Sequence, residues 1–223
     1  MPIKKKPIST RNRILIAVAI TASGALLYVA VQKNGSPTDS GKTAILTSTA
    51  PKDFHGIPPE GVGGDPLLNK QKNRWSAPIE IKTMTISQSI DLPHGELSKQ
   101  GAKDRIRWSS AAATEASAEE SLGMQAEGYL AQIRESGAET ANGRSDVYHD
   151  FHLWITESPG KNKNTGIIVE AIPFWKEHFS GWQLHAFEKL ANANAKVRVT
   201  GWVFWAQEHG SEVGKSRGSL WEI

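Results

Sequence analysis

Residues 151–172 read FHLWITESPGKNKNTGIIVEAI, and this stretch predicts two neighbouring β-strands. The first six residues, FHLWIT, alternate apolar side chains with His, Trp and Thr, which is the period of a strand. A polar loop with a Pro-Gly pair follows, and the next apolar run, TGIIVEAI at 165–172, ends at Pro173. Two such runs separated by a polar loop are typical of a β-hairpin, so we expect 151–156 and 165–172 to pair.

The segments on either side of this hairpin complete a domain over 123–223. Residues 124–134 favour a twisted strand, with a helix as the alternative, and residues 182–195 show apolar side chains at helical spacing. Residues 196–205 alternate as a strand does, and 219–223 predict a short closing strand. The order of three strands, one helix and two strands is that of an OB-fold. We therefore expect a mainly β fold, a small OB-like five-stranded barrel with one helix between strands 3 and 4; a split sandwich and a helix-capped meander are the alternatives.

The region before this domain is less regular. Residues 76–122 contain an Ile- and Thr-rich stretch, 78–92, which predicts a short strand whose change of parity indicates a bulge or an edge contact. Residues 110–121 predict a solvent-facing helix at best, because they have almost no apolar face. Residues 32–75 are rich in Gly, Ser, Thr, Pro and Lys and have few large apolar side chains. Such a composition is typical of a disordered linker.

An uncharged apolar run follows the basic N-terminal tail, residues 1–13. This run, ILIAVAITASGALLYVAV at 14–31, is just long enough to cross a bilayer as a helix. It favours an uncleaved transmembrane anchor over a cleaved signal peptide, which would have a shorter apolar region. Because basic residues stay in the cytoplasm, we expect a single-pass inner-membrane protein whose C-terminal domain is extracytoplasmic, in the periplasm.

Composition limits the classes of partner and site. The 223-residue chain has 26 Lys and Arg against 23 Asp and Glu, a net charge of +3. Residues 1–33 contain six of these cations and no acid, so the rest of the chain has a net charge of −3. An acidic domain repels a phosphate backbone, which disfavours a nucleic-acid partner. The absence of cysteine excludes disulfides, thiolate zinc sites and cysteine nucleophiles.

Four segments of the domain, taken together, show a family likeness. HDFHLWI at 149–155, VEAIP at 169–173, VRVTGW at 197–202 and GKSRGSLWEI at 214–223 resemble a group of uncharacterised bacterial secreted or membrane-anchored proteins with an OB-like barrel. The resemblance covers roughly residues 123–223 and depends on the combination of the four segments. It implies an OB-like fold and a location outside the cytoplasm, and it implies no particular activity.

Three residues of the hairpin form a candidate metal site. Asp150 and His152 are two residues apart and therefore on one face of the first strand, and Glu170 places a charge in the Val- and Ile-rich second strand. Imidazole and carboxylate groups are natural metal ligands and acid–base groups. We expect Asp150, His152 and Glu170 to converge. The competing interpretation is a cross-strand polar pair of His152 and Glu170 on the outside of the barrel.

Tryptophans supply the second candidate site. Trp154, Trp202 and Trp205 predict a surface on which a peptide or glycan stacks, and packing within a small barrel is the competing interpretation.

The sequence GSEVGKS at 210–216 lacks the spacing of a phosphate-binding loop and leads into a strand, so nucleotide binding is rejected. No catalytic residue and no cofactor is predicted.

These patterns favour a non-enzymatic function. We expect a membrane-tethered extracytoplasmic binding or structural module whose partner is an envelope protein, peptide or glycan. The first alternative is a metal-assisted hydrolase that uses Asp150, His152 and Glu170. The second alternative, single-stranded nucleic-acid binding, is disfavoured by the acidic charge of the domain.

Overall fold

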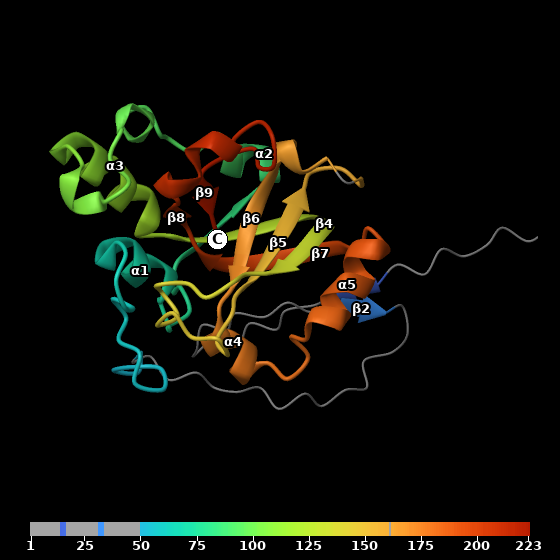
Figure 1. Ribbon diagram of the computed structural model, residues 1–223. Coiled ribbons are helices and arrows are strands. Elements are labelled where there is room, and N and C mark those ends of the chain that lie inside the picture. Colours follow the sequence, from blue (N-terminus) through green and yellow to red (C-terminus); the bar gives the residue numbers. More distant parts are fainter. Residues whose placement is uncertain (1–13, 17–30, 34–49, 161) are drawn as a thin grey trace, which may run out of the picture.

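The computed structural model describes residues 14–16, 31–33, 50–160 and 162–223. Its centre is a curled mixed sheet of seven strands, and helices lie around this sheet (Figure 1). The strands are β3 (Ile81–Met84), β4 (Gly123–Glu135), β5 (Phe151–Thr156), β6 (Gly166–Ala171), β7 (Lys196–Trp202), β8 (Phe204–Trp205) and β9 (Trp221–Glu222).

The long strand β4 is shared by three neighbours. Its first half pairs with β7 in antiparallel and with β3 in parallel orientation, and its second half pairs with β5. β5 pairs with β6, β6 pairs in parallel with β9, and β9 pairs with β8. Only Val203 separates β7 from β8, although the two strands pair with β4 and β9 respectively. The sheet therefore curls into a half-barrel, and a register shift between Leu130 and Gln132 adds to this curvature.

Five α-helices and four 3₁₀ turns surround the sheet in the described part of the chain. The α-helices are α1 (Pro66–Lys72), α2 (Ile86–Ile90), α3 (Ser110–Glu120), α4 (Pro173–His178) and α5 (Leu184–Asn192), and the 3₁₀ turns are Leu97–Lys99, Arg105–Arg107, Lys163–Thr165 and Gln207–Glu212. Side chains cap three of the helices: Asp65 accepts from the first turn of α1, Thr85 forms a capping box with Gln88 in α2, and Ser109 caps α3.

The main hydrophobic core lies against one face of the β5–β6 pair. Leu153 of β5 is directly opposite Val169 of β6, and both contact this core. The other face of the same pair is also buried, with Trp154 and Ile168 packed against Ala131. Because side chains alternate along a strand, each face receives every second residue, and all six residues of β5 are buried.

The predicted fold class requires correction. The prediction was a five-stranded OB-like barrel with one helix between strands 3 and 4, preceded by a transmembrane helix. The structure has a seven-stranded curled sheet, because β3 joins β4 and the predicted fourth strand is divided into β7 and β8. It also has helices outside that one connection, including α1, α2 and α3. Residues 78–92, predicted as one strand, form β3 followed by α2.

The predicted membrane anchor at 14–31 also requires correction. Its two ends form short antiparallel strands, β1 (Ile14–Ile16) and β2 (Val31–Lys33), with Ile14 opposite Lys33. Residues 17–30 and the predicted cytoplasmic tail at 1–13 lie outside the described residues. Among the helices that the structure describes, none is long and apolar enough to cross a bilayer. The predicted location, a single-pass inner-membrane protein with a periplasmic domain, is therefore not supported.

The predicted linker at 32–75 differs from the structure over its second half. Residues 50–75 contain α1 and the buried side chains of Phe54, Leu68 and Trp75. The rings of Phe54 and Trp75 lie 6.0 and 5.8 Å from the ring of Phe174. A few large apolar residues are sufficient here because each one contacts the body of the domain. Residues 34–49 lie outside the described residues.

Candidate metal centre

A group of charged residues is buried on the second face of the β5–β6 pair. His152 of β5 is directly opposite Glu170 of β6, so both side chains point to the same side of the sheet. His152 Nε2 lies 3.4 Å from Glu170 Oε1. The alternation of side chains along β5 and β6 therefore places the His152 imidazole and the Glu170 carboxylate side by side on one face of the strand pair, as the predicted hairpin implies.

The connection between β4 and β5 adds two carboxyl groups. Asp150 immediately precedes β5, and Glu139 belongs to the loop. The Ser136 N–H donates to the Asp150 carbonyl oxygen at 2.9 Å, and the Asp150 N–H donates to Ser136 Oγ at 3.0 Å, which closes the loop at its base. One ligand atom each from Glu139, Asp150 and His152 lies within 4.8 Å of the other two. The closed loop thus holds two carboxyl groups beside the imidazole.

Lys72 reaches the same place from the last turn of α1. Its Nζ lies 3.1 Å from Glu139 Oε2 and 2.9 Å from Glu170 Oε1. The helix is fixed above the loop because Asn73 Nδ2 donates to the Ala141 carbonyl oxygen at 2.8 Å. We call Lys72, Glu139, Asp150, His152 and Glu170 the buried polar cluster.

A second ion pair borders the buried polar cluster. Glu222 of β9 contacts the guanidinium of Arg217, whose Nη2 lies 3.0 Å from Glu212 Oε2. Burial and the nearby Glu170 carboxylate raise the pKa of Glu222 to about 8. This side of the sheet therefore buries several carboxyl groups with few cations to balance them.

The charges of the cluster shift the pKa values of its members in opposite directions. Burial, followed by the charges of Glu139 and Glu170, raises the pKa of Asp150 well above its usual range. Burial alone would lower the pKa of His152, but the carboxylates of Glu139 and Glu170 raise it to about 9. The pKa of Lys72 is raised in the same way against the effect of burial. Burial opposes ionisation of Glu139, yet Lys72 and His152 hold its pKa below the usual value. At neutral pH the cluster thus balances its carboxylates with bound protons and one lysine.

Several buried polar atoms of the cluster have no hydrogen-bond partner among the described residues. They are both ring nitrogens of His152, Oδ2 of Asp150 and Oε2 of Glu170. The other oxygen of Asp150 accepts from Asn142 Nδ2 at 2.9 Å. Buried polar atoms in folded proteins normally have partners, and exceptions often mark a place that a water or an ion completes. The unpartnered atoms belong to the same side chains that the sequence selects as metal ligands.

A surface hollow of about 340 Å³ reaches the buried polar cluster. Lys72 and Glu139 line it together with residues of α1 and of the 3₁₀ turn at 207–212. The side chain of Glu139 is 23% exposed, whereas those of His152 and Glu170 are buried. Glu139 therefore connects the buried ligand atoms with solvent.

Of the three residues predicted as a metal site, Asp150 and His152 have ligand atoms close together, and the third member of that group is Glu139. The predicted third ligand, Glu170, lies 3.4 Å from His152 and forms an ion pair with Lys72. Sequence reasoning missed Glu139 and Lys72. Glu139 lies in a turn-rich stretch without periodicity, and Lys72 was assigned to the linker. The acid–imidazole pair is buried rather than on an exposed exterior, because α1 and the loop at 136–150 cover it.

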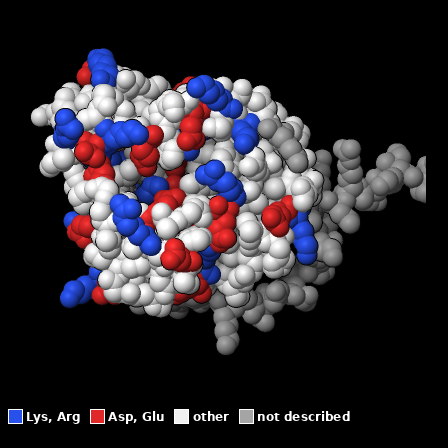
Figure 2. Space-filling model, in the orientation of Figure 1, with Lys and Arg blue, Asp and Glu red and all other residues white. Residues whose placement is uncertain are grey.

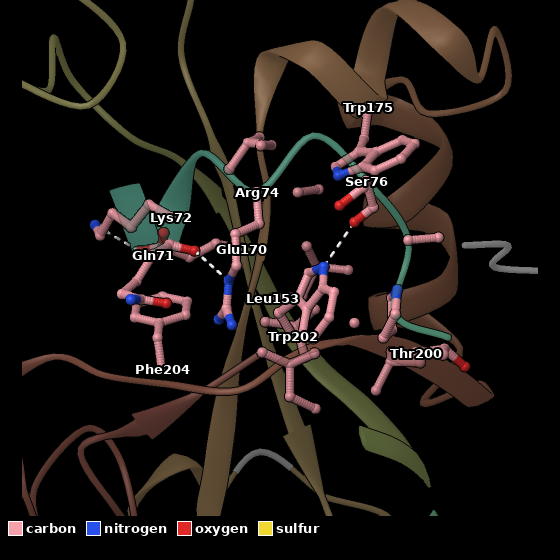
Figure 3. Close-up of a pocket in the computed structure, with 18 of the residues that line it drawn as sticks. Gln71, Lys72, Arg74, Ser76, Leu153, Glu170, Trp175, Thr200, Trp202 and Phe204 are labelled. Carbon is pink, nitrogen blue, oxygen red and sulfur yellow. Dashed lines mark hydrogen bonds and ion pairs between the residues drawn. The ribbon is translucent and has the colours of Figure 1, made fainter. Parts of the chain in front are cut away.

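The three tryptophans predicted as a ligand surface lie in different surroundings. Trp154 and Trp205 are buried, and their indole N–H groups donate to the Ser216 carbonyl oxygen at 2.7 Å and to Gln207 Oε1 at 2.6 Å. Trp202 is half-buried and lines a cavity of about 60 Å³ beside the segment that follows α1. Figure 3 shows its indole N–H directed at the Ser76 carbonyl oxygen, 2.6 Å away. The three rings do not form one common surface.

Charges on the molecular surface are mixed. Figure 2 shows basic and acidic side chains interspersed on the viewed face, without a continuous basic area.

Comparison with known proteins identifies no family, since no family model, no curated protein and no solved structure matches the chain. The resemblance to secreted or membrane-anchored barrel proteins therefore stays a prediction, and the function has to be inferred from the geometry of the site.

Proposed function

We propose that this protein is a binding module for a divalent cation, with Glu139, Asp150 and His152 as the protein ligands. The observation on which this proposal rests is that one ligand atom from each side chain lies within 4.8 Å of the others. In addition, neither ring nitrogen of the buried His152 has a hydrogen bond among the described residues, although Nε2 lies at ion-pair distance, 3.4 Å, from Glu139 and from Glu170. Two carboxylates and one imidazole suit Zn²⁺ or Mn²⁺ better than Ca²⁺, which takes six to eight oxygen ligands.

The surroundings of the three side chains support such a role. A divalent cation would replace bound protons as the partner of the buried carboxyl groups, so that the charge of the site stays balanced. Asn142 fixes one oxygen of Asp150 and leaves the other free to bind. Lys72 already forms ion pairs with Glu139 and Glu170, so a bound cation would share the Glu139 carboxylate with it. Hydrolysis by a bound metal stays a prediction. With three protein ligands, a tetrahedral metal ion would have one coordination position open for a water molecule, as hydrolysis requires.

Titration of the full chain with Zn²⁺ and with Mn²⁺, followed by calorimetry and metal analysis after dialysis, tests the proposal. We expect one equivalent to bind, and we expect Asp150→Asn and His152→Gln to lower the affinity at least tenfold. Asp146→Asn and His185→Gln are matched controls, because both residues are exposed and Asp146 belongs to the same loop as Asp150. Absence of stoichiometric binding, or equal binding by Asp150→Asn and the wild type, contradicts the proposal.

A further inference from the structure

Glu208 lines the same hollow as two members of the buried polar cluster. It belongs to the 3₁₀ turn Gln207–Glu212, and Lys72 and Glu139 line the hollow of about 340 Å³ with it. One of its carboxylate oxygens, Oε1, lies 3.9 Å from His209 Nε2. The other, Oε2, is buried and has no hydrogen-bond partner among the described residues. Buried polar atoms normally have partners, so this oxygen is an acceptor available to a donor that enters the hollow.

Lys72 is a cation that lies near Glu208. Burial opposes the charge of Lys72, yet its two paired carboxylates and, after them, Glu208 raise the pKa of the ammonium well above its usual range. Lys72 Nζ is paired with Glu139 Oε2 at 3.1 Å and with Glu170 Oε1 at 2.9 Å, and within the described ranges it forms no ion pair with Glu208. The side chain of lysine is a flexible four-carbon stem, so its ammonium can change partners within the hollow while α1 keeps its place.

Cation binding at the proposed site would change the surroundings of this ammonium. The two oxygens of Glu139 have different neighbours, since Oε1 lies 3.4 Å from His152 Nε2 and Oε2 is paired with Lys72. A divalent cation bound through Oε1 would therefore share one carboxylate with the ammonium. The two positive charges repel each other, and burial strengthens the repulsion because the effective dielectric constant is low. The cation thus favours movement of the ammonium away from Glu139.

We propose that Glu208 is a positioning residue of the cation site, which accepts the Lys72 ammonium when a divalent cation binds Glu139. This inference rests on the proposed function. The exchange of partners leaves the charge of Glu139 to the cation and keeps Lys72 paired, so that neither buried charge is left without a partner. Glu208 itself binds no cation in this arrangement and acts through Lys72.

Calorimetric titration of the full chain with Zn²⁺ tests the inference. Glu208→Gln retains the size of the side chain and removes its charge, and we expect the affinity for Zn²⁺ to fall about tenfold, as is typical when an outer partner of a metal site is lost. Glu208→Asp retains a carboxylate and should recover part of this loss. The matched control is Asp104→Asn, which removes the same charge from an exposed residue of the same hollow and should bind Zn²⁺ as the wild type does.

Two further measurements show whether Glu208 acts through the lysine. In a Lys72→Met background, Glu208→Gln should not lower the affinity further, because no ammonium then needs an acceptor. NMR spectra of the wild type do not depend on the folding of that variant. We expect nuclear Overhauser contacts between the Lys72 and Glu208 side chains to appear or strengthen when Zn²⁺ is added.

The results separate this inference from the proposed function. A wild type that binds no Zn²⁺ contradicts the proposed function and removes the basis of the inference. A wild type that binds Zn²⁺ no better than Glu208→Gln overturns the role of Glu208 alone. An equal loss of affinity in Asp104→Asn overturns that role as well, because the effect would then come from the net charge of the hollow. Lys72 contacts that Zn²⁺ leaves unchanged have the same consequence.

Discussion

The two faces of the β5–β6 pair bury opposite kinds of side chain. On one face Leu153 is opposite Val169 in the main hydrophobic core, and on the other His152 is opposite Glu170 in the buried polar cluster. The apolar face stabilises the fold by removing hydrocarbon from water, at roughly 25 cal/mol per Å². The polar face stabilises it only while each buried charge has a partner, because desolvation can exceed the attraction within a pair. The cluster is thus costly for stability alone, which is consistent with a binding role.

Removing one charge from the cluster should have the largest effect on stability. Glu170→Leu removes one of the two carboxylates that form ion pairs with Lys72 in the described part of the chain, and we expect the free energy of unfolding to fall by about 3–5 kcal/mol. In Lys72→Met/Glu170→Leu both charges are gone, and the loss should be within about 1 kcal/mol of zero. Urea unfolding of the two single variants and the double variant measures this coupling.

An exposed ion pair of the same helix is the control. Lys70 of α1 lies 2.6 Å from Glu60, with both side chains largely in solvent. Lys70→Met should change the unfolding midpoint little, since exposed pairs contribute little to stability. If Lys70→Met and Glu170→Leu destabilise equally, or if the double variant is as unstable as Glu170→Leu, burial of the cluster is not the cause.

The apolar face should respond to truncation without any coupling to charge. Leu153→Ala removes a buried side chain from the main core and leaves a cavity, and we expect a loss of about 3–4 kcal/mol. The loss should be the same at pH 6 and pH 9, because no titratable group is removed. Urea unfolding at both pH values measures it. A loss that changes by more than about 1 kcal/mol between them would show that the two faces are not independent.

The same alternation explains what the sequence could predict. The strand periods of 151–156 and 165–172 predict a hairpin in which His152 and Glu170 converge, and in the structure the two residues are directly opposite each other. Glu139 could not be found in this way, because its position depends on a loop closed by Ser136 and Asp150 and held by Asn142. A loop of this kind has no period, and its conformation is set by contacts made after folding.

Other differences arise where the average composition of a segment and its local signals indicate different structures. The Asp65–Pro66 pair is a recognisable helix start, with Asp as N-cap and Pro in the first turn, and it marks α1 and therefore Lys72. Low apolar content suggested disorder instead. At 14–31 the uncharged run predicted a helix, whereas its ends, β1 and β2, are extended and paired. Hydropathy reports how apolar a segment is and leaves the backbone conformation open.

Titration of His152 should make the free energy of unfolding depend on pH, and this effect of the polar face is smaller than the effect of removing a charge from it. Its pKa rises from the ordinary value of 6.5 to about 9 in the folded protein, against the effect of burial, because carboxylates of Glu139, Glu170 and Glu222 face it. A folded-state pKa above the unfolded one means that the stabilisation is complete below pH 6.5 and is lost as pH rises toward 9. We expect a loss of at most about 3 kcal/mol over this window.

The histidine has to be separated from Glu222, whose pKa is raised to about 8 and whose protonation also favours the folded state at low pH. His152→Gln removes the imidazole and retains Glu222. Its free energy of unfolding, measured by urea titration at each pH, should therefore fall less between pH 6.5 and 9 than that of the wild type. His185→Gln, at an exposed site on α5, should leave the wild-type slope unchanged. Equal slopes for His152→Gln and the wild type would mean that the imidazolium does not balance the buried carboxylates, and Lys72 alone would then have to do so.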